Sequence, residues 1–165
     1  MSMDRTAFPA SDHDHRACVK SALNDAQKFC QRQGLRLTPI RRRVLELIWQ
    51  SHRPSGAYEL LEQLAAEGHK PSPPTVYRAL DFLLDNLLIH RVSSRNAFVG
   101  CTHPGDEHMA QIFICDRCGT AVEQADASLN RHIRHNAKDL QFRIRTQTVE
   151  LAGVCPLCIG DPDGC

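Results

Sequence analysis

The sequence lacks any long hydrophobic run, and no apolar segment approaches the roughly 18–20 residues that a membrane-spanning helix requires. It also lacks the features of a secretory leader, because residues 1–14 are polar and acidic rather than basic and then apolar. We therefore expect a cytoplasmic protein whose thiols are reduced. In that compartment the eight cysteines favour metal binding over a disulfide framework.

The charge is distributed unevenly along the 165 residues. Residues 1–100 contain 14 Lys and Arg against 10 Asp and Glu, whereas residues 101–165 contain 6 against 9. The window from Arg16 to Arg53 is the most basic, with nine basic and two acidic side chains. A basic half suggests contact with nucleic acid, and an ordinary solvated helical surface is the alternative.

The first half of the sequence predicts four helices. Apolar residues recur at helical spacing between Asp14 and Gln33, and again in "RLTPIRRRVLELIWQS", "SGAYELLEQLAAEG" and "PSPPTVYRALDFLLDN". Start and stop residues flank these segments. They are Gly34, Thr38 with Pro39, Ser55, Gly68 and Ser72. Two short strands follow, "LIHRVSS" and "NAFVGC". This order predicts a winged helix-turn-helix domain over residues 16–99, after a flexible N-terminus at 1–15.

The fourth predicted helix has two distinct faces. Its apolar residues should pack inward. They are Val76, Leu80, Leu83, Leu84 and Leu87. The polar face would enter the major groove of double-stranded DNA, with base contacts near the N-terminal end of the helix. We predict that the DNA-contacting residues are Ser72, Thr75, Tyr77 and Arg78, together with Arg41 from the basic face of the second helix. The alternative is that Tyr77 only packs and Arg78 is only solvated.

The second half predicts a small mixed α/β unit over residues 110–160, so the fold class is α+β. It contains a strand, a turn and a strand at 111–124, a helix at 127–141 and a strand at 142–155. In the helix, Ala127, Ile133 and Leu140 are available for burial. Residues 100–109 form a hinge and 161–165 a tail. A unit of this size needs a metal or a partner subunit for stability, and we expect both.

Two C-x-x-C turns supply such a metal site. Cys115 and Cys118 are separated by 36 residues from Cys155 and Cys158. Two such turns complete a closed four-sulfur shell, so we predict a structural zinc. A redox pair is one alternative, but two matched pairs do not fit it. A deaminase site is another, but the sequence has no His-x-Glu and has Val154, rather than proline, before Cys155.

Further metal ligands remain in the sequence. His90, Cys101, His108 and Glu123 offer two imidazoles, a thiolate and a carboxylate, a donor set that suits zinc better than iron or manganese. Spacing alone does not select these four residues, because an isolated histidine is more often a surface or core residue.

An ordered series of motifs resembles the ferric-uptake-regulator family of metal-responsive repressors, and most closely its zinc-uptake branch. The motifs are "RLTPIR", "PPTVYRALDFLL", "LIHRV", "FVGC", "IFICDRCG" and "CPLC". The resemblance implies a winged helix joined by a hinge to an α/β dimerisation domain. It implies structural zinc at the four C-x-x-C cysteines and regulatory zinc at His90, Cys101, His108 and Glu123. It also implies a homodimer that binds A/T-rich palindromic operators and represses zinc-uptake genes when two Zn²⁺ are bound per subunit.

Departures from the family pattern weigh against two related functions. Iron and peroxide sensors of this family carry a histidine-rich run before the first C-x-x-C, whereas this chain has "HMAQIFIC". Thr146 stands where many relatives have a further histidine. His103, Asp106 and Glu107 remain candidates for an ancillary metal site. A zinc enzyme would need an open coordination position, so we expect neither catalysis nor a small-molecule substrate.

Overall fold

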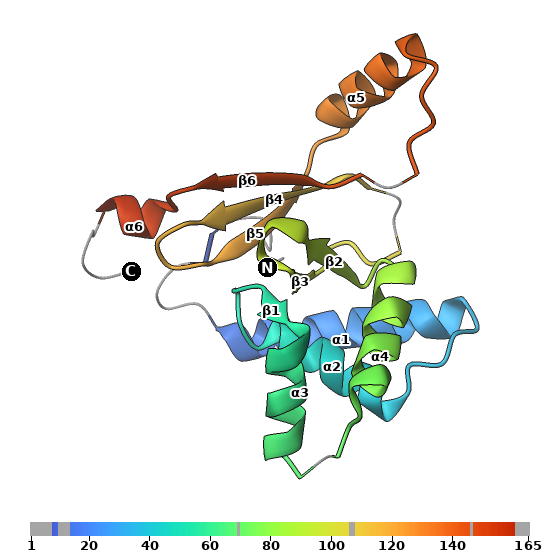
Figure 1. The fold of residues 1–165 in the computed structure, drawn as a ribbon, viewed down its shortest axis with the longest axis vertical. Coiled ribbons are helices and arrows are strands. Elements are labelled where there is room, and N and C mark those ends of the chain that lie inside the picture. Colours follow the sequence, from blue (N-terminus) through green and yellow to red (C-terminus); the bar gives the residue numbers. More distant parts are fainter. Residues whose placement is uncertain (1–7, 10–13, 69, 106–107, 146, 161–165) are drawn as a thin grey trace.

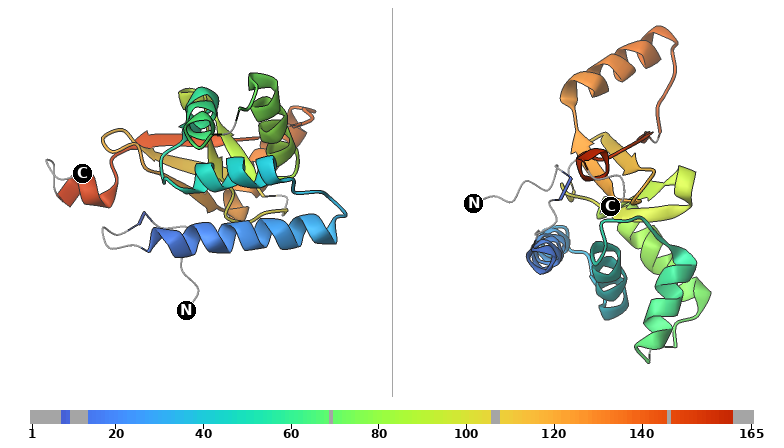
Figure 2. Two further views of the ribbon diagram at one scale, coloured as in Figure 1. Left: turned by 90° about the horizontal axis from the view of Figure 1, so that it is seen from below. Right: turned by 90° about the vertical axis from the view of Figure 1, so that its left-hand side faces the viewer.

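The computed structural model describes residues 8–9, 14–68, 70–105, 108–145 and 147–160. The predicted tail at 161–165 lies outside these residues, as does most of the predicted flexible segment at 1–15. Figure 1 shows a helical layer below and a three-stranded sheet above it, with a β-hairpin between the two. A helix projects from the far side of the sheet (Figure 2).

The lower layer contains the four predicted helices. They are α1 (His15–Arg32), α2 (Pro39–Trp49), α3 (Ala57–Ala66) and α4 (Pro73–Asp85). Asp14 caps α1 by accepting a hydrogen bond from the backbone N–H of Ala17, and Gly34 follows with a φ of +66°. The apolar faces meet in one core that includes Ile48 of α2, Leu60 of α3 and Leu80 of α4, all fully buried. The predicted helical periodicity is therefore confirmed.

A small antiparallel sheet follows α4. Its strands are β1 (Ser55–Gly56), β2 (Ile89–Val92) and β3 (Ala97–Gly100), in the order β1-β3-β2. The short 3₁₀ helix η1 (Ser93–Arg95) joins β2 to β3, and Asn96 turns the chain with a φ of +47°. The hairpin predicted from the sequence is thus present. Together with the four helices it has the arrangement of a winged helix-turn-helix.

Two details of the predicted helices are wrong. Ser55 does not cap α3, because it pairs with Phe98 in β1 and Gly56 occupies the N-cap position instead. Pairing with β3 holds the Ser55 backbone in a strand, which short-range sequence signals do not reveal. Leu87 lies beyond the end of α4 with a φ of +52° and is half-buried, and the neighbouring Leu88 enters the core in its place.

The upper sheet contains β4 (Ala110–Cys115), β5 (Ala121–Ala125) and β6 (Val149–Gly153), in the order β5-β4-β6. Strand β4 pairs antiparallel with β5 and parallel with β6. The short helix α6 (Pro156–Gly160) follows β6. Side chains of the hairpin pack against β4, where Val92 forms a buried cluster with Ala110, Ile112 and Ile114. This cluster joins the wing to the upper sheet.

The strand predicted over residues 142–155 is mostly wrong, because only Val149–Gly153 forms it. Its partner β4 begins at Ala110, and the parallel register joins Gln111 to Val149. By this register the described residues before Thr148 lie beyond the start of β4 and have no β4 residue to pair with. Alternating polar and apolar residues predicted a strand, but a strand also requires a neighbouring strand.

Helix α5 (Ala127–Asp139) stands away from the rest of the chain (Figures 1 and 2). Asp126 caps it through hydrogen bonds from the N–H groups of Ser128 and Leu129. None of its residues is buried, and Leu140 just beyond it is 78% exposed. The burial expected for Ala127, Ile133 and Leu140 is therefore not found within one chain.

Candidate metal centres and DNA-binding surface

The four cysteines of the C-x-x-C turns form one cluster. Cys115 ends β4 and Cys118 lies in the next turn, while Cys155 precedes α6 and Cys158 lies within it. Their four sulfur atoms lie within 4.8 Å of one another. The Sγ–Sγ distances are 3.6 Å from Cys115 to Cys158 and 3.8 Å from Cys118 to Cys155. The parallel pairing of β4 with β6 brings these distant segments together.

The backbone around Cys115 favours its thiolate form. Burial raises the pKa of Cys115, but hydrogen bonds from the backbone N–H groups of Cys118, Cys155 and Arg117 outweigh burial and lower the pKa to about 6. The N–H of Cys155 donates to Cys115 Sγ at 3.3 Å. Thiolates are the ligands that zinc takes. With Zn–S bonds near 2.3 Å, tetrahedral sulfurs lie about 3.8 Å apart, so the cluster fits a structural zinc ion.

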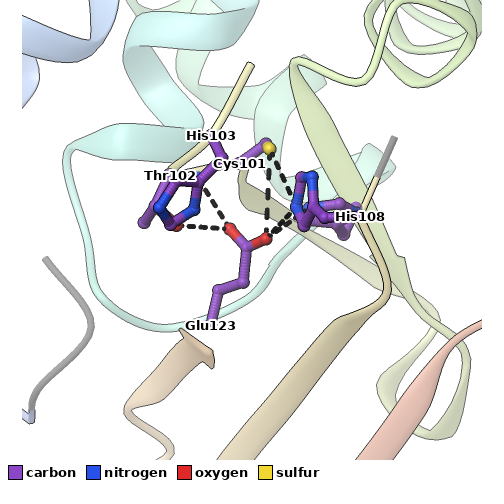
Figure 3. Close-up of polar contacts among 6 residues, drawn as sticks. Cys101, Thr102, His103, His108 and Glu123 are labelled. Carbon is purple, nitrogen blue, oxygen red and sulfur yellow. Dashed lines mark hydrogen bonds and ion pairs between the residues drawn. The ribbon is translucent and has the colours of Figure 1, made fainter. Parts of the chain in front are cut away.

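A second cluster lies where the two layers meet. His90 comes from β2, Cys101 and His108 from the connection between β3 and β4, and Glu123 from β5. Their donor atoms also lie within 4.8 Å of one another. The Oε1 atom of Glu123 lies 3.0 Å from His90 Nε2 and 2.5 Å from His108 Nε2. The sulfur of Cys101 lies 3.6 Å from His108 Nε2 and 4.0 Å from Glu123 Oε1 (Figure 3).

Glu123 is a buried carboxylate that its neighbours keep ionised. Its side chain is 1% exposed. Burial alone raises the pKa of Glu123, but hydrogen bonds with His108, His90 and the N–H of Thr102 outweigh burial and hold the pKa well below its usual range. Two imidazoles, one thiol and one carboxylate converge on a single point, as a tetrahedral zinc site requires. The four residues fit a zinc ion by donor type and by spacing.

A family model described as the ferric uptake regulator family matches residues 32–152. The zinc uptake regulation protein of Escherichia coli strain K12 is 37% identical over 143 residues, which are 86% of this chain and 83% of that protein. This chain belongs to the ferric uptake regulator family. Its N-terminal layer is accordingly the winged helix-turn-helix domain that the sequence predicted.

Solved structures of relatives also match. A structure of a zinc uptake regulator complexed with zinc and DNA has a TM-score of 0.81 and 36% identity, covering 89% of this chain and 98% of that one. Holo XcZur has a TM-score of 0.79 and 43% identity, covering 85% and 98%. Apo XcZur, also 43% identical and covering 87% and 99%, has a TM-score of only 0.51. Both XcZur structures have the same sequence identity to this chain, so the difference between their TM-scores reflects a difference in conformation between the holo and apo structures. By TM-score this chain is more similar to the holo structure than to the apo structure.

In this family member the predicted DNA contacts lie mostly at one end of α4. Ser72 and Arg78 are exposed, Tyr77 is 46% exposed and Thr75 is half-buried. The hydroxyls of Ser72 and Thr75 lie 2.9 Å apart. Arg41 differs from these residues. Its guanidinium stacks on the Phe82 ring of α4 at 3.7 Å and donates to the carbonyl of Arg36. Arg41 therefore contacts the helix that carries the other residues.

Further contacts between the layers lie outside the metal clusters, and sequence reasoning missed them. Glu150 of β6 accepts hydrogen bonds from the N–H groups of Ser93 at 2.6 Å and Ser94 at 3.0 Å. Arg95 forms an ion pair with Asp116 at 3.2 Å. No spacing or motif indicates these pairs, because the partners are 57, 56 and 21 positions apart in the sequence.

The candidates for an ancillary site are only partly described. Asp106 and Glu107 lie outside the described residues, as does Thr146. His103 is exposed, and its ring lies 5.6 Å from that of His108. Cys18 and Cys30 are buried in α1. Among the residues that the structure describes, no helix combines the length and apolar character needed to cross a bilayer.

Proposed function

We propose that this chain is a zinc-responsive, DNA-binding transcriptional regulator for which zinc is the corepressor. The observation that carries the proposal is the cluster of His90, Cys101, His108 and Glu123, which joins side chains of the winged helix to side chains of the upper sheet. Relatives at 36–37% identity, whose names refer to zinc uptake and in one case to bound zinc and DNA, support zinc and DNA as the ligands.

The two clusters would hold two zinc ions per chain with different roles. Cys115, Cys118, Cys155 and Cys158 would form a closed shell that stabilises the upper sheet. His90, Cys101, His108 and Glu123 would form the regulatory site. Because each site offers four protein donors, neither leaves the open position that zinc catalysis needs, which argues against an enzyme and against a small-molecule substrate.

Regulation follows from where the regulatory ligands lie. Zinc supplies the positive charge that holds two neutral imidazoles, a thiolate and a carboxylate at one point. His90 lies on the wing strand β2 and Glu123 on β5, so shared ligation prevents the layers from separating. The winged helix then keeps one orientation on the upper sheet. The coupling free energy equals the difference in zinc-binding free energy between this arrangement of the layers and one in which they are separated. Such couplings are typically about 1–3 kcal/mol.

The functional unit would be a homodimer on operator DNA. Leu140, Phe142, Leu151 and Ile159 are exposed on the side of β6 and α5, where a second copy would cover them. Two-fold symmetry places two α4 helices on half-sites about 34–36 Å apart, which requires a palindromic operator. The resemblance to the family implies A/T-rich operators of zinc-uptake genes. A regulator of this kind works in the cytoplasm, without a membrane partner.

The test is operator binding at buffered free zinc for wild type and for Cys101→Ala. The variant loses the only thiolate of the regulatory cluster, so it should keep about one zinc per chain and the dimer but lose zinc-dependent binding. Cys30→Ala is the matched control, because it removes another fully buried thiol that lies in α1 and in neither cluster. This control should respond to zinc as wild type does.

A wild-type response by Cys101→Ala would refute the regulatory assignment. The same titration with iron(II) and manganese(II) tests the other functions of the family. If iron(II) or hydrogen peroxide controlled binding at concentrations where zinc did not, the chain would be an iron or peroxide sensor instead.

A further inference from the structure

The two oxygens of Glu123 have different partners. Oε1 faces the other three ligands of the regulatory cluster. Oε2 faces Thr102, whose backbone N–H donates to it at 2.6 Å and whose hydroxyl donates to it at 2.9 Å (Figure 3). Thr102 directly follows Cys101 in the connection between the layers. The carboxylate therefore has one oxygen for a metal ion and one for the connecting segment.

The direction of the Thr102 hydroxyl is determined by its neighbours. An ionised carboxylate only accepts hydrogen bonds, so the single hydroxyl proton points to Glu123. The Nδ1 atom of His103 lies 2.9 Å from the same hydroxyl oxygen and must donate to it. A chain of hydrogen bonds thus runs from exposed His103 through half-buried Thr102 to buried Glu123.

This arrangement restricts how Glu123 binds a metal ion. To act as a bidentate ligand, the carboxylate would have to turn Oε2 toward the ion and give up both hydrogen bonds from Thr102. With Oε2 held, the cluster offers four single donor atoms, which is the tetrahedral geometry that zinc accepts. Manganese(II) favours six oxygen-rich positions instead.

We propose that Thr102 is a specificity-determining positioning residue, which holds Glu123 as a one-oxygen ligand and so keeps the regulatory site four-coordinate. This inference rests on the proposed function, because it concerns the metal site of that function. Residues that orient metal ligands from behind typically change metal affinity 10–100-fold when they are altered. Thr102 acts through Glu123 and does not itself bind the ion.

The test compares Thr102→Val, which keeps the shape but lacks the hydroxyl, with the conservative Thr102→Ser. Cobalt(II) is added to protein whose four-cysteine cluster retains zinc. Wild type and Thr102→Ser should show the intense visible bands of four-coordinate cobalt. Thr102→Val should show weaker bands of higher coordination, about tenfold lower zinc affinity and a smaller preference for zinc over manganese(II). Thr102→Ala removes the same hydroxyl and provides a second variant if the valine disturbs folding.

The possible outcomes separate the two proposals. Wild-type cobalt spectra and zinc affinity in Thr102→Val and Thr102→Ala would overturn the role of Thr102 while leaving the proposed function intact. Equal losses in the serine and valine variants would also overturn it, since the hydroxyl would then not matter. Failure of wild type to bind cobalt through Cys101, seen as no spectral change between wild type and Cys101→Ala, would overturn the proposed function itself.

Discussion

Arg41 and Arg78 were both predicted to contact DNA, but their guanidinium groups lie in different surroundings. Arg41 is held between α2 and α4 by the Phe82 ring and the carbonyl of Arg36. Arg78 is exposed on α4. A side chain fixed against the protein positions the helix, whereas an exposed arginine near the N-terminal end of a recognition helix can reach a base edge.

Arg78→Ala should weaken operator binding by about 1–3 kcal/mol if Arg78 makes a bidentate base contact. The measurement is binding to the operator and to a scrambled duplex at one salt concentration. Arg42→Ala is the control, because Arg42 is exposed on α2. Loss of a phosphate contact weakens binding to both duplexes alike. An equal loss on both duplexes for Arg78→Ala would assign Arg78 to the phosphate backbone.

Gly100 shows how one residue connects the core to the proposed metal ligands. A Cβ atom there would lie 2.1 Å from Cε2 of Trp49, so only glycine allows the indole to pack against the end of β3. Cys101 follows directly. Trp49 is the only tryptophan of the chain and is 8% exposed. Its fluorescence therefore reports on the segment that carries Cys101, a proposed metal ligand.

At the scale of elements, the wing is docked on the upper sheet rather than exposed along its whole length. Glu150 of β6 accepts from the two N–H groups at the start of η1, and Arg95 pairs with Asp116 beside the cysteine cluster. These bonds join the layers without a metal ion. They favour the same arrangement as the regulatory ligands do.

Glu150→Gln should loosen the wing, because the amide is a weaker acceptor for the N–H groups of Ser93 and Ser94. Hydrogen exchange at these two amides should become several-fold faster, and more zinc should be needed for operator binding. Glu62→Gln, an exposed change on α3, is the control and should leave both quantities unchanged. Unchanged exchange in Glu150→Gln would show that Glu150 does not hold the wing on the upper sheet.

The pH dependence of wing docking follows from the same carboxylate. Burial raises the pKa of Glu150, but hydrogen bonds from the Ser94 hydroxyl and the two N–H groups outweigh it, so the pKa is lowered. A lowered carboxyl pKa stabilises the docked form above the ordinary value of about 4.3, and the contribution is lost as the pH falls through the lowered pKa. Amide protection at Ser93 and Ser94 should therefore persist at neutral pH and decrease in acid.

At the scale of the whole molecule, the two metal clusters differ in what their loss would cost. The four cysteines join the end of β4 to α6 within one layer, where a structural zinc contributes on the order of 10–16 kcal/mol in comparable small domains. The proposed regulatory ligands join the upper sheet to the helical layer, which has a buried core of its own. Loss of the regulatory ion should change the arrangement of the two layers, and loss of the structural ion should unfold the upper sheet.

Stepwise chelation should therefore show two stages. A weak chelator should remove one zinc per chain, abolish operator binding and change the emission of Trp49, with helix content retained. A stronger chelator should remove the second zinc and unfold the upper sheet. His90→Ala is the matched control, because it lacks a regulatory ligand and should show only the second stage. Simultaneous loss of both ions and of structure in wild type would contradict two independent sites.

Local sequence patterns predicted the helices and strands better than they predicted which strands pair with one another. The helices, the hairpin and the β4–β5 turn follow from periodicity and from flanking residues such as Pro39 and Gly34, because these effects act within a few residues. The prediction for residues 142–155 was mostly wrong because the extent of β6 depends on the length of β4. Ser55 was assigned to a helix for a related reason, since its pairing with Phe98 is not local.

Residue order alone indicates the chemistry of this protein: which thiols come in matched pairs, which helix carries a polar face, and which donors suit zinc. The packing of separate strands brings His90 and Glu123, 33 positions apart, to one point with Cys101 and His108. The same packing places Thr102 where its N–H and hydroxyl donate hydrogen bonds to Oε2 of Glu123. The reason is physical, because donor type is a property of one residue, whereas coordination geometry depends on how separate strands pack.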